Sequence, residues 1–475
     1  MISKIRFFYF LVIITVISCS KDASTTVIQP QESPLKEITI FHINDQHGKL
    51  ENFSKIKHII DEEKKITNVF FVCSGDIFSG NPVVDNHEEK GFPMIDLMNK
   101  VGIDVAVIGN HEFDYGESIL KDRFQQSQFD WVCANVDMNA TGIKEPYEYK
   151  TITKDNVKVT FLGLIETNGS PTETIPLTHP WRVKNLTFKK YTSVIENYAS
   201  VKETEQSDLY IALTHLGDNV DANIATNYTY FDFIIGGHSH QKVSQETNGI
   251  PIFQAGSNLN YLGKINITIE NKQVKNYTHD LIDLSTYTAT DTEINSIVQE
   301  YNDLADLDEV IGFAETYHSR THVGNFYTEA LKYELNADLT FQNTGGVRSD
   351  LNKGDITKKE IYTIDPFNNG ALTYSMTIGE IKTFLKDNKV GLYYAGLIIE
   401  QDGNTIEIRT EDGQILNNNT TITLGINDYI PAVYSNYFNN PIFSSNTTAE
   451  NLIHYLETNK DPINFTTYQS YFKFE

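Results

Sequence analysis

Five short polar clusters in the first half of the chain contain residue types that bind divalent metal ions. Each cluster follows an apolar run, and glycines flank most of them. The clusters are Asn44-Asp45-Gln46-His47-Gly48, Gly75-Asp76, Gly109-Asn110-His111-Glu112-Phe113-Asp114, Thr214-His215 and Gly236-Gly237-His238-Ser239-His240. Carboxylate, imidazole and amide groups without a thiolate suit ions such as zinc, manganese or iron. These residue types therefore predict a metal site assembled from several segments.

The number of candidate ligands predicts a pair of ions rather than a single one. One ion needs only three or four protein ligands, and the clusters offer more. An aspartate shared by two ions would hold them roughly 3.5–4 Å apart, and such a pair lowers the pKa of a bridging water to give a hydroxide nucleophile at neutral pH. We therefore expect two divalent cations, zinc, manganese or similar. They would also supply positive charge to a chain whose formal net charge is −25.

The apolar runs before the clusters have the length and composition of buried strands. They are residues 38–43, 69–73, 105–108, 209–213 and 231–235, and residues 157–165 and 250–254 are compatible with strands of a second sheet. Segments between the runs, such as residues 53–63 and 94–101, have the apolar spacing of helices. Strands alternating with helices predict an α/β fold, in which ligands bind at the carboxyl ends of the strands. The clusters should therefore converge at one edge.

In type and order, the five clusters resemble the motifs of the metallophosphoesterase superfamily, and specifically its bacterial 5′-nucleotidase and UDP-sugar hydrolase-like family. The resemblance implies a layered α/β/β/α domain that hydrolyses phosphate esters with two metal ions. It assigns Asp45, His47, Asp76 and His240 to the first ion and Asp76, Asn110, His215 and His238 to the second. It also assigns His111 and Asp114 as the catalytic pair, in which the imidazolium stabilises charge on the phosphoryl oxygens and the carboxylate orients it.

The second half of the chain predicts a further domain. Residues 290–293 (Thr-Asp-Thr-Glu) have the pattern of a helix start, and apolar residues at helical spacing follow. We expect a phosphoesterase domain at residues 38–285, a linker helix within 286–312, and a smaller α+β C-terminal domain at 313–475.

This C-terminal domain resembles the substrate-binding domain of the same family. Residues 343–348 (Asn-Thr-Gly-Gly-Val-Arg) and 366–369 (Pro-Phe-Asn-Asn) match two of its motifs. The resemblance implies that the guanidinium of Arg348 binds the substrate phosphate, as a bidentate donor can. The substrate pocket would contain Asn343, Gly346, Arg348, Phe367, Asn369, Tyr394 and Tyr429.

The identity of the substrate stays open at this point. In the family two aromatic rings hold the base; Tyr394 matches the first, and Tyr429 or Tyr434 is a candidate for the second. The glycine-rich motif that normally precedes the second ring is absent. We expect a nucleoside 5′-monophosphate, or a nucleotide sugar or nucleoside polyphosphate. The alternatives are a 2′,3′-cyclic-nucleotide 2′-phosphodiesterase with 3′-nucleotidase activity and a surface lipoprotein that binds without catalysis.

The first residues predict export and a membrane anchor. Lys4 and Arg6 precede an apolar run at residues 7–17, which is too short to span a bilayer and is typical of a signal peptide. Residues 16–19 (Val-Ile-Ser-Cys) resemble a bacterial lipobox. We expect a signal peptide at 1–18, a lipid on Cys19 and a flexible stalk at 19–37. An ordinary cleaved signal peptide is the alternative.

The expected location is therefore the periplasm or the cell surface, as a lipoprotein of the outer membrane. The acidic charge disfavours binding of nucleic-acid polymers. The oligomeric state is open.

Two further residue pairs are interpreted as structural. Cys73 and Cys133 lie in apolar runs, so we expect buried thiols rather than a disulfide. His318 and His322 have helical spacing, but no carboxylate or cysteine is placed to complete a third metal site. We expect a solvated pair of histidines there.

Overall fold

The computed structural model describes residues 35–304, 307–467 and 470–475. The predicted signal peptide, Cys19 and most of the predicted stalk lie outside the described residues. The first strand begins at Lys36 rather than at the predicted Ile38. In the ranges that the structure describes, no helix has the length and apolar character needed to cross a membrane.

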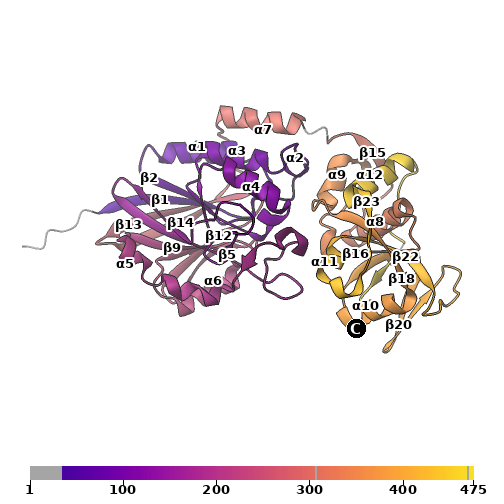
Figure 1. The fold of residues 1–475 in the computed structure, drawn as a ribbon. Coiled ribbons are helices and arrows are strands. Elements are labelled where there is room, and N and C mark those ends of the chain that lie inside the picture. The colour runs from indigo at the N-terminus through magenta and orange to yellow at the C-terminus, as the bar shows by residue number, and fades with distance from the viewer. Residues whose placement is uncertain (1–34, 305–306, 468–469) are drawn as a thin grey trace, which may run out of the picture. The chain divides into compact units, whose positions relative to one another are not determined.

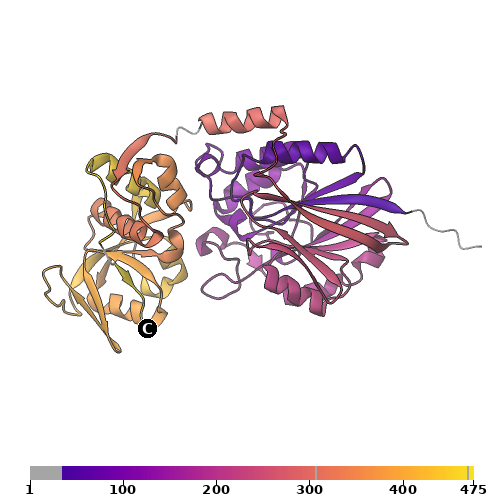
Figure 2. The ribbon, with the colours of Figure 1, turned by 180° about the vertical axis from the view of Figure 1, so that it is seen from behind.

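The N-terminal domain contains two six-stranded sheets (Figure 1). The first has the order β14-β13-β1-β2-β3-β4, in which β1 to β4 are parallel and β13 is antiparallel to its neighbours. Its strands are β1 (Lys36–Ile43), β2 (Asn68–Cys73), β3 (Val105–Val107), β4 (Asp130–Val132), β13 (Tyr261–Glu270) and β14 (Gln273–Asp283). Figure 2 shows the long β13 and β14 strands side by side, as their pairing requires.

The second sheet has the order β11-β12-β10-β9-β7-β6. Its central strands β7, β9, β10 and β12 are parallel, and the two edge strands are antiparallel to them. The strands are β6 (Tyr149–Lys154), β7 (Val157–Ile165), β9 (Leu209–His215), β10 (Phe233–Ile235), β11 (Lys242–Thr247) and β12 (Ile250–Ala255). The second sheet inferred from residues 157–165 and 250–254 is therefore present.

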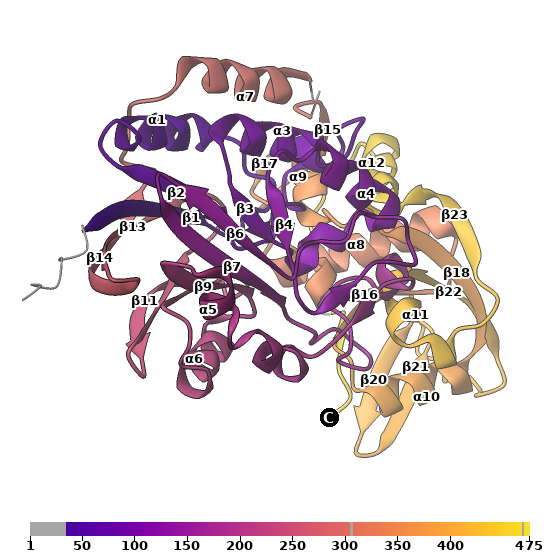
Figure 3. The same cartoon turned by 60° about the vertical axis from the view of Figure 1, so that its left-hand side comes forward.

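The two sheets pack face to face, with helices on their outer faces (Figure 3). Ile40 and Val72 of the first sheet share one core with Ile211 and Phe233 of the second. Helices α1 (Phe53–Glu63), α3 (Phe92–Val101) and α4 (Gly116–Gln126) cover the first sheet, and α6 (Asp218–Asn227) covers the second beside the short α5 (Val201–Glu205). The burial of apolar surface on both sides of each sheet produces the α/β/β/α layers that the resemblance implied.

Helix α7 (Thr292–Leu304) follows this domain and corresponds to the predicted linker helix. Its buried residues Ile294 and Val298 join the core of the N-terminal domain. The backbone N–H of Ile294 donates to Asp291 Oδ1 at 2.9 Å, so the side chain of Asp291 caps the helix start. The helix is thus an outer layer of the first domain as well as a connection to the second.

The C-terminal domain is built on a six-stranded sheet of order β23-β18-β22-β16-β19-β24. These strands are β16 (Leu339–Asn343), β18 (Gly370–Thr377), β19 (Leu392–Ala395), β22 (Thr421–Asn427), β23 (Ile442–Thr447) and β24 (Tyr471–Phe472). The helices around it are α8 (Arg320–Leu335), α9 (Lys358–Ile364), α10 (Ile378–Asn388), α11 (Tyr429–Val433) and α12 (Thr448–Thr458). Two strand pairs complete the domain: β15 (Val310–Ala314) with β17 (Gly354–Thr357), and β20 (Ile398–Asp402) with β21 (Thr405–Arg409).

The cysteine interpretation is confirmed, and the prediction of a solvated histidine is wrong for His318. Cys73 and Cys133 are free and buried, and burial raises the pKa of each thiol to about 12. His318 is fully buried rather than solvated. Its Nε2 accepts from the N–H of Phe465 at 3.0 Å, and its Nδ1 lies 2.9 Å from Thr316 O. It precedes α8 and holds two chain segments together, which helical spacing alone could not reveal.

Candidate functional site

All predicted metal ligands lie at the carboxyl ends of strands. Asp45 and His47 follow β1, Asp76 follows β2, and Asn110 follows β3 at the start of the short 3₁₀ helix η1 (Asn110–Phe113). His215 is the last residue of β9, and His238 and His240 follow β10. Because these strands run parallel within each of two stacked sheets, the loops of both sheets meet at one edge.

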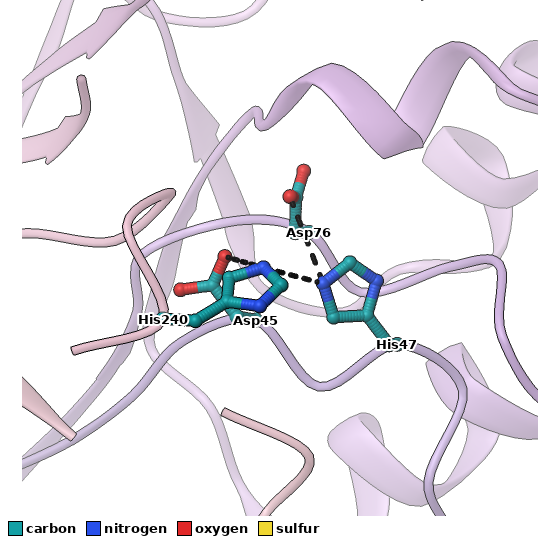
Figure 4. A group of neighbouring side chains, drawn as sticks. All are labelled: Asp45, His47, Asp76 and His240. Carbon is teal, nitrogen blue, oxygen red and sulfur yellow. Dashed lines mark hydrogen bonds and ion pairs between the residues drawn. The ribbon is translucent and has the colours of Figure 1, made fainter. Parts of the chain in front are cut away.

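The first group of side chains consists of Asp45, His47, Asp76 and His240, whose ligand atoms lie within 4.8 Å of one another (Figure 4). His240 Nε2 is 3.4 Å from Asp45 Oδ1, and His47 Nε2 is 4.0 Å from Asp76 Oδ2. The Nε2 atoms of His47 and His240 are 3.0 Å apart. His240 is partly exposed and the other three are buried, so the group opens to one side.

The second group consists of Asp76, His215 and His238, again within 4.8 Å. Asp76 Oδ2 is 3.1 Å from His215 Nε2. The carboxamide oxygen of Asn110 extends the group, at 3.2 Å from His215 Nε2 and 3.0 Å from His238 Nδ1. Asp76 belongs to both groups, as a carboxylate shared by two ions must.

Backbone carbonyls orient two of the imidazoles for coordination. His47 Nδ1 is 3.1 Å from Ser79 O, and His215 Nδ1 is 2.6 Å from Ser74 O. Since a carbonyl only accepts, each Nδ1 carries a proton, and Nε2, which faces the carboxylates, is the atom that would bind an ion. Carboxylate, imidazole and amide donors gathered within these distances suit a dinuclear centre of borderline divalent ions.

The backbone at these residues is in a conformation that side chains other than glycine rarely adopt. The φ angles of Asp45, His47, Asp76, His238 and His240 are 50°, 47°, 55°, 79° and 57°. Left-handed conformations of such residues cost about 1–3 kcal/mol each and cluster at functional sites, where the surrounding structure holds them. These five backbone conformations therefore lower the stability of the fold and direct the side chains toward one point.

Two glycines permit the close approach of the loops. A Cβ at Gly75 would lie 2.7 Å from the backbone N of Gly109 and 2.9 Å from His215 Nδ1. A Cβ at Gly237 would lie 2.6 Å from Ser74 O. No side chain fits at either position, so loops from both sheets can touch only because these residues are glycine.

His111 and Asp114 form a buried ion pair beside the metal ligands. His111 Nδ1 is 2.6 Å from Asp114 Oδ2, and the backbone N–H of His111 donates to Asp76 Oδ1 at 2.9 Å. Burial alone would lower the pKa of His111, but the charges of Asp114 and Asp76 outweigh it and raise the pKa to about 9. Burial would raise the pKa of Asp114, but the charge of His111 outweighs it and lowers that pKa below its ordinary value. The pair is thus an imidazolium held by a carboxylate.

A cavity of about 200 Å³ adjoins this pair. Most of the predicted substrate-binding residues line it: Asn343, Gly346, Arg348, Phe367, Asn369 and Tyr429. His111 and Asp114 form another part of the wall. The cavity therefore brings the predicted catalytic pair together with the predicted phosphate-binding guanidinium.

Tyr394 is the predicted substrate residue that the structure places elsewhere. It lies on β19, is 9% exposed, and packs in a hydrophobic core with Leu339, Phe341 and Leu392. It is not among the residues that line the cavity. A stacking role for Tyr394 stays a prediction, whereas Tyr429 is at the cavity surface.

One segment of the cavity wall, residues 177–182, was not among the predicted site residues. Thr178 Oγ1 donates to Asp114 Oδ1 at 3.1 Å, and Arg182 Nη2 donates to Phe367 O at 2.7 Å. His179 Nε2 is 3.2 Å from Asp428 Oδ1. This irregular segment follows β7, so the same rule about strand ends could have identified it.

We predict that Thr178→Val slows catalysis without removing metal. The hydroxyl holds the carboxylate oxygen of Asp114 that does not face His111, and valine keeps the shape while losing that donor. A hydrogen bond to a charged group contributes about 1.5–3 kcal/mol, so we expect kcat to fall roughly tenfold or more. Steady-state kinetics and metal analysis would test this, and unchanged kcat would show that Asp114 needs no such support. Thr172→Val, on an exposed threonine, is the control.

Two protein families match the chain. Residues 38–242 match the family described as Calcineurin-like phosphoesterase, and residues 304–457 match the 5′-nucleotidase, C-terminal domain. These regions coincide with the two-sheet domain and the domain built on β16 and its neighbours.

Two bacterial relatives match most of the chain. The Trifunctional nucleotide phosphoesterase protein YfkN of Bacillus subtilis (strain 168) is 25% identical over 482 residues, which cover 85% of this chain and 32% of YfkN. The chain thus spans about a third of the length of that relative. A 5′-nucleotidase of Vibrio vulnificus (strain CMCP6) is 25% identical over 422 residues, 74% of this chain and 75% of that protein.

A solved structure has the same fold. The 5′-nucleotidase precursor from Thermus thermophilus superposes with a TM-score of 0.74 at 19% identity, covering 89% of this chain and 96% of that one. The matched families, the layered fold and the Asp/His clusters agree. The chain therefore combines a domain of the calcineurin-like phosphoesterase family with a 5′-nucleotidase C-terminal domain.

Proposed function

We propose that this protein hydrolyses phosphate esters of nucleotides with the help of two divalent metal ions. The observation that carries the proposal is the position of Asp76. It belongs to both candidate ligand groups and also accepts the backbone N–H of His111. One carboxylate thus links the metal centre to the catalytic pair, and the pair lines the cavity that contains Arg348.

The proposed ligands are Asp45, His47, Asp76 and His240 for one ion and Asp76, Asn110, His215 and His238 for the other. Bound there, the two ions would supply the Lewis acidity that activates water and offsets the charge of the phosphate. His111, held protonated by Asp114, donates a hydrogen bond to a phosphoryl oxygen as negative charge develops there. Thr178 and Asp114 keep the imidazole in place, so little reorganisation is needed during the reaction.

Arg348, which lines the same cavity, is proposed to bind the phosphate. Its guanidinium carbon lies 5.5 Å from the centre of the Phe367 ring, a distance at which the ring attracts the cation. A planar guanidinium can donate two parallel hydrogen bonds to a phosphate, whereas a lysine ammonium acts as a point charge.

We predict that both Arg348→Ala and Arg348→Lys lower kcat/KM. Loss of the paired donors should cost about 2–4 kcal/mol, which is roughly 30-fold to 10³-fold, and lysine should recover only a small part. Arg409→Ala is a matched control, because Arg409 lies in the same domain on β21 and pairs with Glu400 away from the cavity. Full recovery by lysine would contradict a bidentate contact.

The preferred substrate is proposed to be a nucleoside 5′-monophosphate, or a nucleotide sugar or nucleoside polyphosphate. Support comes from Tyr429, Phe367 and Asn343, which offer aromatic and amide surface next to Arg348. The decisive experiment removes metal by chelation, restores manganese or zinc by titration, and assays AMP, UDP-glucose and 2′,3′-cyclic AMP in parallel.

Preference for 2′,3′-cyclic AMP would favour the cyclic phosphodiesterase, which the unusual Asn427-Asp428-Tyr429 sequence keeps open. No phosphate release from any nucleotide, with one still bound, would favour a non-catalytic binding protein. The intact His111–Asp114 pair argues for catalysis, because binding alone does not need an imidazolium beside a metal centre. The signal-like start and the Cys19 motif support export and lipid anchoring as part of the proposal.

A further inference from the structure

A buried carboxylate outside both ligand groups lies behind the metal centre. Asp221 is on α6, and its side chain is inaccessible to solvent. It is not among the residues of either candidate metal group. The proposed catalytic roles of the other residues do not involve Asp221. Burying a carboxylate costs stability unless it is hydrogen-bonded, so its presence requires a reason.

Hydrogen bonds connect Asp221 to both histidine-bearing segments of the second sheet. Thr214 Oγ1, next to His215, donates to Asp221 Oδ1 at 2.6 Å. Gln254 Nε2 donates to Asp221 Oδ2 at 3.2 Å, and Gln254 Oε1 accepts from Ser239 Oγ at 2.8 Å. Ser239 lies between His238 and His240. The carboxylate therefore accepts a hydrogen bond directly from the segment that carries His215. It is linked through the side chain of Gln254 to the segment that carries His238 and His240.

The loop after β10 also packs directly on this carboxylate. A Cβ at Gly236 would lie 2.1 Å from Asp221 Oδ2, so only glycine lets the backbone approach so closely. The N–H of Gly217, which precedes α6, donates to Gly237 O at 3.1 Å and joins the same two segments through the backbone. Helix α6 and the residue before it thus pack directly against the loop that follows β10.

We propose that Asp221 is a positioning residue for the metal centre, acting through Thr214 and through Gln254 and Ser239. It fixes the distance between the end of β9, which carries His215, and the loop that carries His238 and His240. Because these histidines belong to both ligand groups, loss of the hydrogen bonds to Asp221 weakens the binding of both ions. The inference rests on the proposed metal centre but not on the identity of the substrate.

The left-handed backbone conformation of the loop after β10 explains why it needs supporting contacts. His238 and His240 adopt φ angles of 79° and 57°, which cost free energy that surrounding contacts must supply. Residues that orient metal ligands by hydrogen bonding typically change metal affinity by about 10-fold to 100-fold when they are replaced. A change in metal affinity of that size can be measured separately from any change in the stability of the protein.

The test compares Asp221→Ala, Asp221→Asn and the matched control Asp232→Asn. Asp232 is another largely buried aspartate of the same domain, but it lies just before β10 and accepts from Tyr210 N and Lys202 Nζ. Mn²⁺ affinity is measured on the full chain by competition with a chelator, and the unfolding midpoint is measured without metal. We expect Asp221→Ala to weaken Mn²⁺ binding about 10-fold to 100-fold. Asn should have a smaller effect because its amide oxygen can still accept from Thr214.

Asp232→Asn should leave Mn²⁺ affinity unchanged. A lower unfolding midpoint for Asp221→Ala with unchanged Mn²⁺ affinity would overturn the proposal and leave Asp221 a structural residue. If Asp221→Ala fails to fold, Thr214→Val is tested instead, because it removes only the hydroxyl that donates to Asp221. Thr214→Val should weaken Mn²⁺ binding by about threefold to tenfold. A wild-type protein that binds Mn²⁺ but hydrolyses no nucleotide would refute the proposed function while leaving this inference standing.

Discussion

Asp76→Asn is expected to abolish metal-dependent activity and to reduce the metal content of the purified protein. Asp76 is the only carboxylate shared by the two candidate groups among the described residues, and its Oδ2 is 3.1 Å from His215 Nε2. Asparagine removes the negative charge that two cations would share. Since metal ions contribute several kcal/mol to stabilising the transition state, we expect activity to fall by about 10³-fold or more. Elemental analysis and phosphate-release assays would measure both effects.

A partly buried aspartate, Asp104, controls for the general effect of losing a carboxylate. Asp104 lies before β3, at the opposite end of the strand from Asn110, and pairs with Lys154 at 2.6 Å. Asp104→Asn should lower the unfolding midpoint slightly and leave metal content unchanged. An Asp76→Asn protein that is fully loaded and fully active would refute the metal centre proposed here.

His111→Ala is expected to keep both metal ions and lose most of the activity. The imidazole is not among the candidate ligands, but its pKa of about 9 keeps it charged at neutral pH as a donor to the phosphoryl oxygens. Loss of such a donor typically costs 10²-fold to 10³-fold in kcat. The fall should appear in kcat more than in KM, because the interaction strengthens as charge develops. Metal analysis alongside kinetics separates this result from that of Asp76→Asn.

The role of Asp114 can be tested through the same histidine. If Asp114 acts by orienting His111, the double variant His111→Ala/Asp114→Ala should be no slower than His111→Ala alone. His454→Ala is the matched control, because His454 forms an exposed pair with Glu334 at 2.7 Å in the C-terminal domain. Additive losses in the double variant would show that Asp114 has an independent role in the reaction.

The architecture could be inferred largely from local patterns. The helix at Phe53–Glu63 and the strand at Val157–Ile165 have the bounds that apolar spacing predicted. The start of helix α8 at Arg320 could not be inferred in this way, because its first turn lacks a clear apolar stripe. Export, the anchor at Cys19 and the domain boundaries stay predictions.

The candidate ligands of the metal centre can be identified from the order of residues along the chain. Parallel strands deliver their last residues to one edge, so polar clusters after apolar runs identify Asp45, Asp76 and His215 without coordinates. The contacts of Thr178 with Asp114 and of Asp221 with Thr214, and the packing of Tyr394 in a core, become visible only in the folded chain. These residues owe their places to contacts between segments far apart in the chain. Such contacts depend on how sheets, helices and irregular loops pack together, and no local spacing records them.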